Sequence, residues 1–203
     1  MFITLEGTEG VGKSTLIRNL QAYFEERGRE VVLCREPGGT PLAEDIRGLL
    51  LDPEISEKVN ENTELMLMYA SRMQNININI LPALNDFKIV LCDRFFDSSV
   101  CYQSFGRGSN REKLDILNKH FVNIIPDITF WLDAPIEVGM ERANNRGKLD
   151  RFEKEKLEFF KKVRHGYEVL HQEEPGRIKR LDATQSTDLV FQTAIAYLEN
   201  LSF

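Results

Sequence analysis

The run Phe2-Ile3-Thr4-Leu5-Glu6 leads directly into Gly7-Thr8-Glu9-Gly10-Val11-Gly12-Lys13-Ser14 near the start of the chain. The first stretch has the apolar character of a strand, and the second matches the pattern G-x-x-x-x-G-K-[ST] in full. In this pattern the glycines let backbone N–H groups curl around a phosphate, the lysine reaches the β and γ oxygens, and the serine ligates Mg²⁺. A chance glycine-rich turn is the alternative, but the flanking strand and helix signals argue against it.

Four further β-type runs occur along the chain, and helix-like sequence follows each of them. These runs lie at 30–35, 88–93, 127–133 and 177–182. Strands that alternate with helices predict an α/β fold, a five-stranded parallel sheet with helices on both faces. Such sheets bind ligands at the carboxyl ends of their strands. We see no linker or repeat, and we expect one domain over residues 1–203.

Helical stretches are expected at 13–27, 41–51, 56–81, 111–122, 135–146, 151–171 and 186–201. One of them contains Asn75-Ile76-Asn77-Ile78-Asn79-Ile80, which alternates with the period of a strand. We interpret it as helix because no turn signal precedes it and because Ile76 and Ile80 lie one helical turn apart. Pro82 is expected to end this helix.

The composition argues against several classes of protein. Among 203 residues, 26 Lys and Arg stand against 32 Asp and Glu, and the net charge of −6 disfavours a surface built to bind nucleic acid or anionic lipid. No apolar run approaches the ~18 residues that span a bilayer. The three cysteines, Cys34, Cys92 and Cys101, contain no C-x-x-C pair. We therefore expect a reduced, cytoplasmic protein with no membrane or nucleic-acid partner.

The phosphate loop alone does not separate kinases from GTPases or motors. A GTPase needs N-K-x-D to bind guanine, and here Phe121 occupies the position of the carboxylate in Asn118-Lys119-His120-Phe121. The D-x-x-G pattern at 45–48 lies in a leucine-rich, helix-like stretch and not after a strand, so we attribute it to coincidence.

Two arginines lie where a second phosphate would be expected. Asp93 and Arg94 end the third expected strand, and Arg47 lies in the helix after the turn 35–40. Arginine at such a place forks onto phosphate oxygens, and a salt bridge to a carboxylate such as Glu36 is the alternative. Asp93 suits either indirect coordination of a metal ion or orientation of Arg94.

With these motifs the chain resembles the thymidylate kinase family, P-loop kinases that phosphorylate dTMP. The matching motifs run in order from Gly7 to Asp182 and cover nearly the whole chain. They are the phosphate loop, Arg35-Glu36-Pro37-Gly38-Gly39-Thr40, the arginine within 46–51, Tyr69-Ala70-Ser71-Arg72, Asp93-Arg94-Phe95 through Tyr102-Gln103, Leu132-Asp133 and 146–151. The resemblance implies a P-loop nucleoside monophosphate kinase fold, ATP with Mg²⁺ as donor, dTDP as product, and a homodimer formed through the long apolar helix at 56–81.

The resemblance also implies roles for individual residues. ATP binding is expected at Gly7, Thr8, Glu9, Gly10, Val11, Gly12, Lys13, Ser14, Thr15 and Arg142, and metal binding at Ser14 and Asp93. Acceptor binding is expected at Glu9, Arg47, Met68, Arg72, Arg94, Ser99, Tyr102 and Gln103. In this assignment Arg72 donates to a thymine carbonyl, Tyr102 packs on the deoxyribose, and Glu9 lies near the 3′-hydroxyl and the metal. Met68 replaces the phenylalanine that commonly stacks on thymine, which gives a softer contact through its thioether.

A mobile lid is expected at about 142–152, where Arg142, Arg146 and Arg151 accompany Gly147. An arginine that closes over the transferred phosphoryl group stabilises its charge and excludes water. Because the phosphate loop carries no arginine, the resemblance implies that the catalytic arginine comes from the lid. The catalytic set it implies is Lys13, Arg94, Arg146, Arg151 and Glu9. A solvated helix face is the alternative for these arginines.

The acceptor of such a reaction is already an anionic phosphate, so no general base is required, and positioning and charge neutralisation carry the catalysis. Two alternatives remain open from the sequence. One is a different nucleoside monophosphate kinase, if Met68 has changed the base preference. The other is a regulatory module that binds ATP without turnover.

Overall fold

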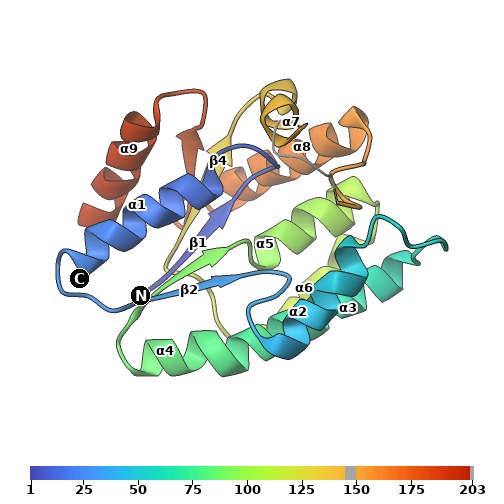
Figure 1. The fold of residues 1–203 in the computed structure, drawn as a ribbon, viewed down its shortest axis with the longest axis horizontal. Helices are drawn as coiled ribbons and strands as arrows, with labels where there is room; N and C mark the ends of the chain where they lie inside the picture. Colours follow the sequence, from blue (N-terminus) through green and yellow to red (C-terminus); the bar gives the residue numbers. More distant parts are fainter. Residues whose placement is uncertain (145–149, 202–203) are drawn as a thin grey trace.

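A computed structural model describes residues 1–144 and 150–201 of the chain. Its strands form one parallel sheet in the order β2-β3-β1-β4-β5 (Figure 1). The strands are β1 (Phe2–Glu6), β2 (Val31–Arg35), β3 (Ile89–Asp93), β4 (Ile128–Asp133) and β5 (Ile178–Asp182). The expected five-stranded parallel sheet is therefore confirmed. Because β1 is central, the phosphate loop that follows it lies at the middle of the carboxyl edge.

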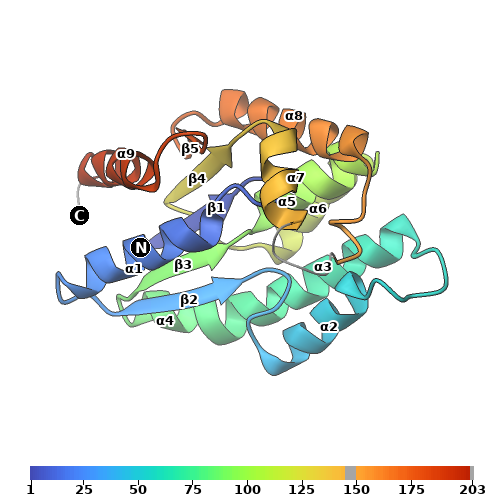
Figure 2. The same cartoon turned by 45° about the horizontal axis from the view of Figure 1, so that its top comes forward.

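Helices cover both faces of the sheet, and two apolar clusters fill the space between (Figure 2). On one face lie α1 (Lys13–Glu25) and α9 (Thr187–Glu199). On the other lie α3 (Glu61–Asn75), α4 (Leu81–Asn85), α6 (Arg111–Phe121) and α8 (Leu157–Glu173). Side chains alternate along β1, so Ile3 and Leu5 pack towards α1 and α9, while Phe2 belongs to the opposite cluster. None of the described helices is long and apolar enough to cross a membrane.

The helix expected at 56–81 has different limits in the structure. Asn60 caps α3, so the helix begins at Glu61, and a π-helical segment η1 (Ile76–Ile80) joins it to α4. The prediction that Pro82 ends the helix is wrong, because Pro82 lies in the first turn of α4. A π turn changes the hydrogen-bond spacing, and a proline in the first turn of the next segment is tolerated because the N–H it lacks is not required there.

The tertiary contacts of this segment explain its strand-like alternation. Ile76 and Ile80 are buried in the core, whereas Asn75 donates to Glu36 and Asn79 donates to the carbonyl oxygen of Gly39. The asparagines thus hold the turn that follows β2, while the isoleucines pack under the sheet. Polar and apolar positions both recur after four residues, which is compatible with a helix.

Two more differences concern the carboxyl edge. The segment after β3 forms a short helix α5 (Phe96–Ser99) and a second π-helical segment η2 (Val100–Gly106), which the sequence analysis did not predict. The helix expected at 151–171 begins at Leu157, because Asp150 accepts the backbone N–H groups of Phe152 and Glu153 and forms a turn instead. The helix α2 (Pro41–Leu51) has the expected limits.

The phosphate loop packs directly on the backbone of α7 (Ile136–Asn144), the helix that follows β4. A Cβ atom on Gly10 would lie 2.0 Å from the carbonyl oxygen of Gly139, and one on Gly139 would lie 2.5 Å from that of Glu9. Both distances are shorter than real contacts, so two glycines are required for this approach. The loop and the helix before the expected lid are consequently in direct contact.

Two glycine-to-alanine substitutions test this close contact. Gly48→Ala in α2 has no atom within 4 Å of the added Cβ, and we expect it to raise the free energy of unfolding by about 0.5–1 kcal/mol. Gly139→Ala adds the same methyl group to α7 against the loop, and we expect a loss of about 1–3 kcal/mol and weaker ATP binding. Urea unfolding and ATP titration measure both quantities, and equal stabilisation by the two variants would contradict the packing described here.

Candidate functional site

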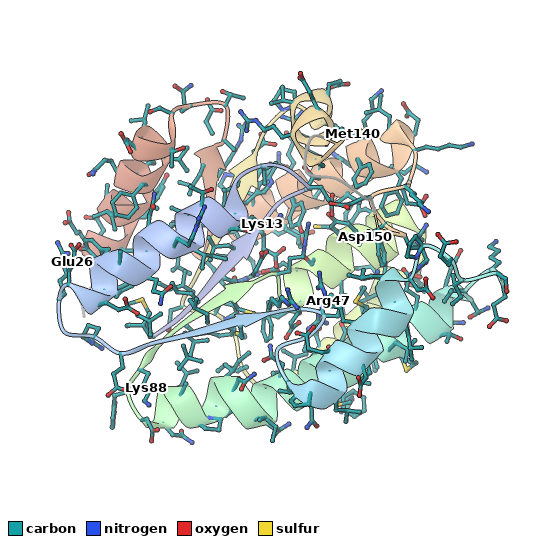
Figure 3. All side chains as sticks on the ribbon, in the orientation of Figure 1. Lys13, Glu26, Arg47, Lys88, Met140 and Asp150 are labelled. Carbon is teal, nitrogen blue, oxygen red and sulfur yellow. The ribbon has the colours of Figure 1, made fainter. Side chains whose placement is uncertain are left out.

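A large cavity of about 800 Å³ opens at the carboxyl edge of the sheet. The phosphate loop forms its floor, with Glu9 through Thr15 among the lining residues. Arg18, Arg35, Arg47, Arg94 and Arg142 also line it. Figure 3 shows Lys13 on α1, Arg47 on α2 and Asp150 in the segment before α8 around this central region. Five carboxylates of the described residues line the same cavity, namely Glu9, Glu36, Asp93, Asp150 and Glu153, so six basic side chains surround the loop together with acidic partners. Basic groups around such a loop suit a polyphosphate.

A second, smaller cavity of about 90 Å³ lies beside the first. Its lining includes Met68, Arg72, Ser99, Tyr102 and Gln103, the residues expected around an acceptor nucleoside. Glu9, Glu36, Arg47, Arg94 and Asp150 line both cavities. The two cavities meet at these shared residues, and a group passing from one ligand to the other would pass between them.

The loop itself is held by Lys13, the first residue of α1. Its ammonium group donates to the carbonyl oxygens of Gly7 and Thr8 at 3.1 and 2.8 Å. Burial, followed by the charge of Arg94, lowers the pKa of Lys13 to about 8. A bound phosphate would act in the opposite direction, because an anion favours the charged lysine. The buried lysine is thus well suited to bind an anion.

Arg47 projects from α2 into the junction of the two cavities. Its guanidinium donates to the carbonyl oxygen of Pro37 at 2.8 Å, and within the described residues it forms no ion pair with a carboxylate. Burial and the neighbouring Arg35 lower the pKa of Arg47. Among the residues that the structure describes, Arg47 lacks the salt bridge considered as its alternative, which leaves the guanidinium available for an anion.

Arg94 adopts an uncommon backbone conformation at the end of β3. Its φ is +69°, a left-handed value that costs a non-glycine residue about 1–2 kcal/mol. Its side chain forms an ion pair with Glu9 at 2.9 Å, and Tyr102 donates to the same carboxylate at 2.8 Å. Glu9 therefore contacts both an arginine and a hydroxyl, so its charge beside a phosphate site is compensated.

A fully buried carboxylate, Glu6, lies behind Arg94. It accepts hydrogen bonds from the N–H of Phe95 at 2.7 Å, from Ser98 at 2.5 Å and from Tyr167 at 2.7 Å. Burial first, and then the charge of Asp97, raise the pKa of Glu6 to about 7. The ionisable groups around it are Lys13, Arg72, Arg94, Asp97, Cys101 and Tyr167.

Arg72 lies at the base of the small cavity and is almost completely buried. It donates to Glu36 at 2.6 Å and to Ser99 at 3.0 Å, but its Nη1 atom is buried and has no hydrogen-bond partner among the described residues. A buried donor without a partner is costly, and it fits a ligand acceptor in this cavity. The neighbouring Gln103 is held by Glu64 at 3.0 Å.

Asp93, on the ATP side of the site, also has a buried polar atom that a ligand could satisfy. Its Oδ1 atom is buried and, in the part of the chain that the structure describes, has no hydrogen-bond partner. Both Asp93 and Ser14 line the large cavity. Carboxylate and hydroxyl oxygens suit Mg²⁺, which is usually held by one or two carboxylates together with substrate phosphates. No group of three or more His, Cys, Asp or Glu side chains among the described residues could hold a metal ion alone. The residues present fit a cation shared with a nucleotide.

The arginines of the expected lid lie in different environments. Arg142 lines the large cavity and donates to the carbonyl oxygen of Ala183, directly after β5, at 3.4 Å. Arg146 lies outside the described residues. Arg151 donates to Leu50 and to Glu64, each at 2.7 Å, and it lines neither cavity. Its role as a catalytic group stays a prediction.

Several polar residues that hold the site together were not predicted from the sequence. They are Glu6, Glu64, Ser98 and Tyr167, whereas Glu36 was considered as an alternative partner of Arg47 or Arg94 and instead binds Arg72. Glu6 carried a recognisable signal, because it is a charged residue at the end of a mostly apolar strand. Glu64 and Tyr167 carried none, because both lie in helices with many polar residues.

Comparison with known proteins agrees with this geometry. The sequence profile of the thymidylate kinase family matches residues 5–194. A thymidylate kinase of Acinetobacter baumannii (strain AYE) is 61% identical over 198 residues, covering 98% of this chain and 100% of that protein. A thymidylate kinase of Psychrobacter sp. (strain PRwf-1) is 46% identical over 93% of this chain and 92% of its own length. The crystal structure of Ehrlichia chaffeensis thymidylate kinase superimposes with a TM-score of 0.80 at 32% identity, covering 98% of each chain.

The raised pKa of Glu6 predicts a pH dependence of stability. The carboxyl ionises near 4.5 in an unfolded chain but near 7 in the fold, so the folded state binds the proton more tightly between these values. We expect the free energy of unfolding of the wild type, relative to Glu6→Gln, to fall as the pH rises from about 5 to about 7 and then to level off. Denaturant unfolding at pH 5, 6, 7 and 8 measures this, with the exposed Glu61→Gln as control. Parallel profiles for wild type and Glu6→Gln would contradict the raised pKa.

Proposed function

The chain belongs to the thymidylate kinase family and transfers the γ-phosphoryl group of ATP to dTMP, giving dTDP and ADP, and we propose that it does so where its two cavities meet. The observation that carries this placement is the set of residues shared by both cavities, which includes Arg47 and Arg94. ATP would occupy the large cavity above the phosphate loop, and dTMP the small one.

The acceptor phosphate would bind between Arg47 and Arg94. Arg94 already has Glu9 as a partner, and Arg47 has only a backbone carbonyl oxygen among the described residues. Two guanidinium groups neutralise the acceptor phosphate, so that it can approach the γ-phosphoryl group without strong repulsion. Lys13 neutralises the donor from the opposite side. The deprotonated phosphate is itself the nucleophile, so positioning and charge neutralisation suffice.

Ser14 and Asp93 are the residues that would hold Mg²⁺ in this proposal. The buried, unpartnered Oδ1 of Asp93 supports it. Held there, the ion would supply positive charge that offsets the charge developing on the transferred phosphoryl group. On the acceptor side, the unpartnered Nη1 of Arg72 supports a hydrogen bond to a thymine carbonyl, and Met68 lies in the same cavity wall. The hydroxyl of Tyr102, fixed by Glu9, supports its proposed position against the deoxyribose.

The lid at about 142–152 is proposed to supply the catalytic arginine. Arg146 is one candidate. Arg142 lines the large cavity and would support the lid from the side on which ATP binds. Arg151 is the other candidate. Its guanidinium would have to leave Glu64 to reach the phosphates, so its contribution requires a rearrangement of the turn that Asp150 forms.

We further propose that residues 1–203 form one domain and that the protein is cytoplasmic. Both apolar clusters pack on the same sheet, which supports a single domain. Cys34, Cys92 and Cys101 are free thiols, which supports a reducing compartment.

A homodimer is proposed to form through the helices around α3. Six large apolar side chains are exposed on this group of adjacent helices, namely Leu42 and Leu49 on α2, Met66 on α3, Ile78 on η1, and Ile116 and Phe121 on α6. A second copy of the chain would remove this apolar surface from water.

The dimer proposal predicts a change in mass on substitution of Met66. We expect Met66→Asp to convert a dimer into a monomer, because it places a charge in the apolar contact. Leu189→Asp introduces the same change at an exposed leucine of α9, and we expect it to leave the mass unchanged. Analytical ultracentrifugation distinguishes the two, and a wild-type monomer at micromolar concentration would refute the dimer.

The phosphate clamp is tested by single substitutions of its arginines. We expect Arg47→Ala and Arg94→Ala each to raise the KM for dTMP roughly 10- to 100-fold, because each removes charge-assisted hydrogen bonds to a phosphate. The KM for ATP should change far less. Arg27→Ala, on an exposed arginine that lines neither cavity, serves as control. Coupled measurement of ADP release gives both constants, and an unchanged KM for dTMP in both variants would refute the clamp.

A further inference from the structure

The guanidinium of Arg94 is held on two sides before any ligand binds. On one side Nη2 donates to Glu9 at 2.9 Å, a contact already assigned to the site. On the other side Nη1 faces two hydroxyl groups, Ser98 at 3.3 Å and Tyr167 at 3.4 Å. These two hydroxyls come from α5 and α8, elements that meet only in the folded protein.

Both hydroxyls are in turn bound to one carboxylate oxygen of Glu6. Ser98 donates to its Oε2 at 2.5 Å and Tyr167 at 2.7 Å. A hydroxyl that donates its proton to a carboxylate has only lone pairs left for its other neighbours. Ser98 and Tyr167 also lie 2.9 Å from each other, but with both protons directed to the ionised carboxylate, both oxygens present lone pairs to Arg94. Arg94 therefore donates to the two hydroxyls, and the hydroxyls donate to Glu6.

The same carboxylate also fixes the backbone of the arginine. Its Oε1 atom accepts the N–H of Phe95, and the N–H of Arg94 is bound to the carbonyl oxygen of Leu5 at 3.0 Å. The end of β1 therefore holds the peptide groups on both sides of the left-handed residue. Such a conformation persists only when its surroundings determine it.

From these contacts we propose that Glu6, acting through the hydroxyls of Ser98 and Tyr167, is a positioning residue that fixes Arg94 in the orientation that binds the acceptor phosphate. The inference rests on the proposed clamp role of Arg94. Glu6 lies directly before the phosphate loop, so the strand that positions the donor site also positions the arginine of the acceptor site. The donor site and the acceptor site are then both positioned by one strand, β1.

A purely structural role for Glu6 is the competing explanation, and the hydroxyl of Tyr167 separates the two. Tyr167→Phe keeps the ring, which stacks near Trp131, and removes only the hydroxyl, with its contacts to Arg94, Glu6 and Ser98. We expect it to raise the KM and the dissociation constant for dTMP roughly three- to tenfold, with the KM for ATP changed less than about twofold. Glu6→Gln keeps the shape but presents an amide, and we expect a rise of roughly 10- to 100-fold for dTMP.

Thr4→Val is the matched control. It removes a buried hydroxyl from the same strand, one that is bound to Thr129 at 2.7 Å and not to Arg94. We expect a comparable loss of thermal stability and no change in dTMP binding. Calorimetric titration with dTMP in the absence of ATP measures binding without turnover, and steady-state kinetics separates KM from kcat.

The double variants with Arg94→Ala make the result decisive. If Glu6 and Tyr167 act through the arginine, Tyr167→Phe weakens dTMP binding in the wild type and has no further effect in Arg94→Ala. Equal effects in both backgrounds would overturn the inference, as would Tyr167→Phe behaving like Thr4→Val. If Glu6→Gln does not fold, the double-mutant cycle of Tyr167→Phe and Arg94→Ala still tests the inference. Failure of the clamp is distinguishable, because Arg94→Ala alone would then leave dTMP binding unchanged.

Discussion

Several cations must be held close together at one edge of the sheet before any phosphate arrives, and this constraint governs the structure of the site. Lys13, Arg47 and Arg94 line one cavity, and their charges repel one another. Lys13 is bound to backbone carbonyl oxygens, Arg47 is likewise bound to a carbonyl oxygen, and Arg94 is paired with Glu9. Each cation thus has a partner that orients it without blocking its approach to an anion.

Buried carboxylates from other parts of the chain also hold the arginines in place. Glu36 holds Arg72, Glu64 holds Arg151 and Gln103, and Glu6 holds the hydroxyls behind Arg94. An unpaired carboxylate in the interior is costly, so each of these groups is stable only with its partners in place. Their mutual dependence makes the site rigid, as a reaction that depends on positioning requires.

Sequence reasoning succeeded where the information was local. The five strands, the helix at Pro41–Leu51 and the phosphate loop follow from short-range patterns. The family resemblance predicted acceptor binding at Arg47, Arg72 and Arg94; all three line the small cavity, and their roles stay predictions. Sequence reasoning failed at Pro82, which follows the π-helical segment η1, and after β3, where η2 forms, because such segments have no simple periodicity. It also missed the turn before α8, because that turn depends on hydrogen bonds from Asp150.

The sequence by itself determined the class of fold and the chemistry of the donor site, because a strand, a glycine-rich loop and a helix in direct succession make a phosphate site without help from the rest of the chain. Only the tertiary structure decided which carboxylate holds which arginine. Glu6 and Tyr167 lie 161 residues apart, and Arg151 and Glu64 lie 87 apart. Such pairs are selected by the packing of α3, α5 and α8 on one face of the sheet, and no periodicity within a segment encodes a partner in another.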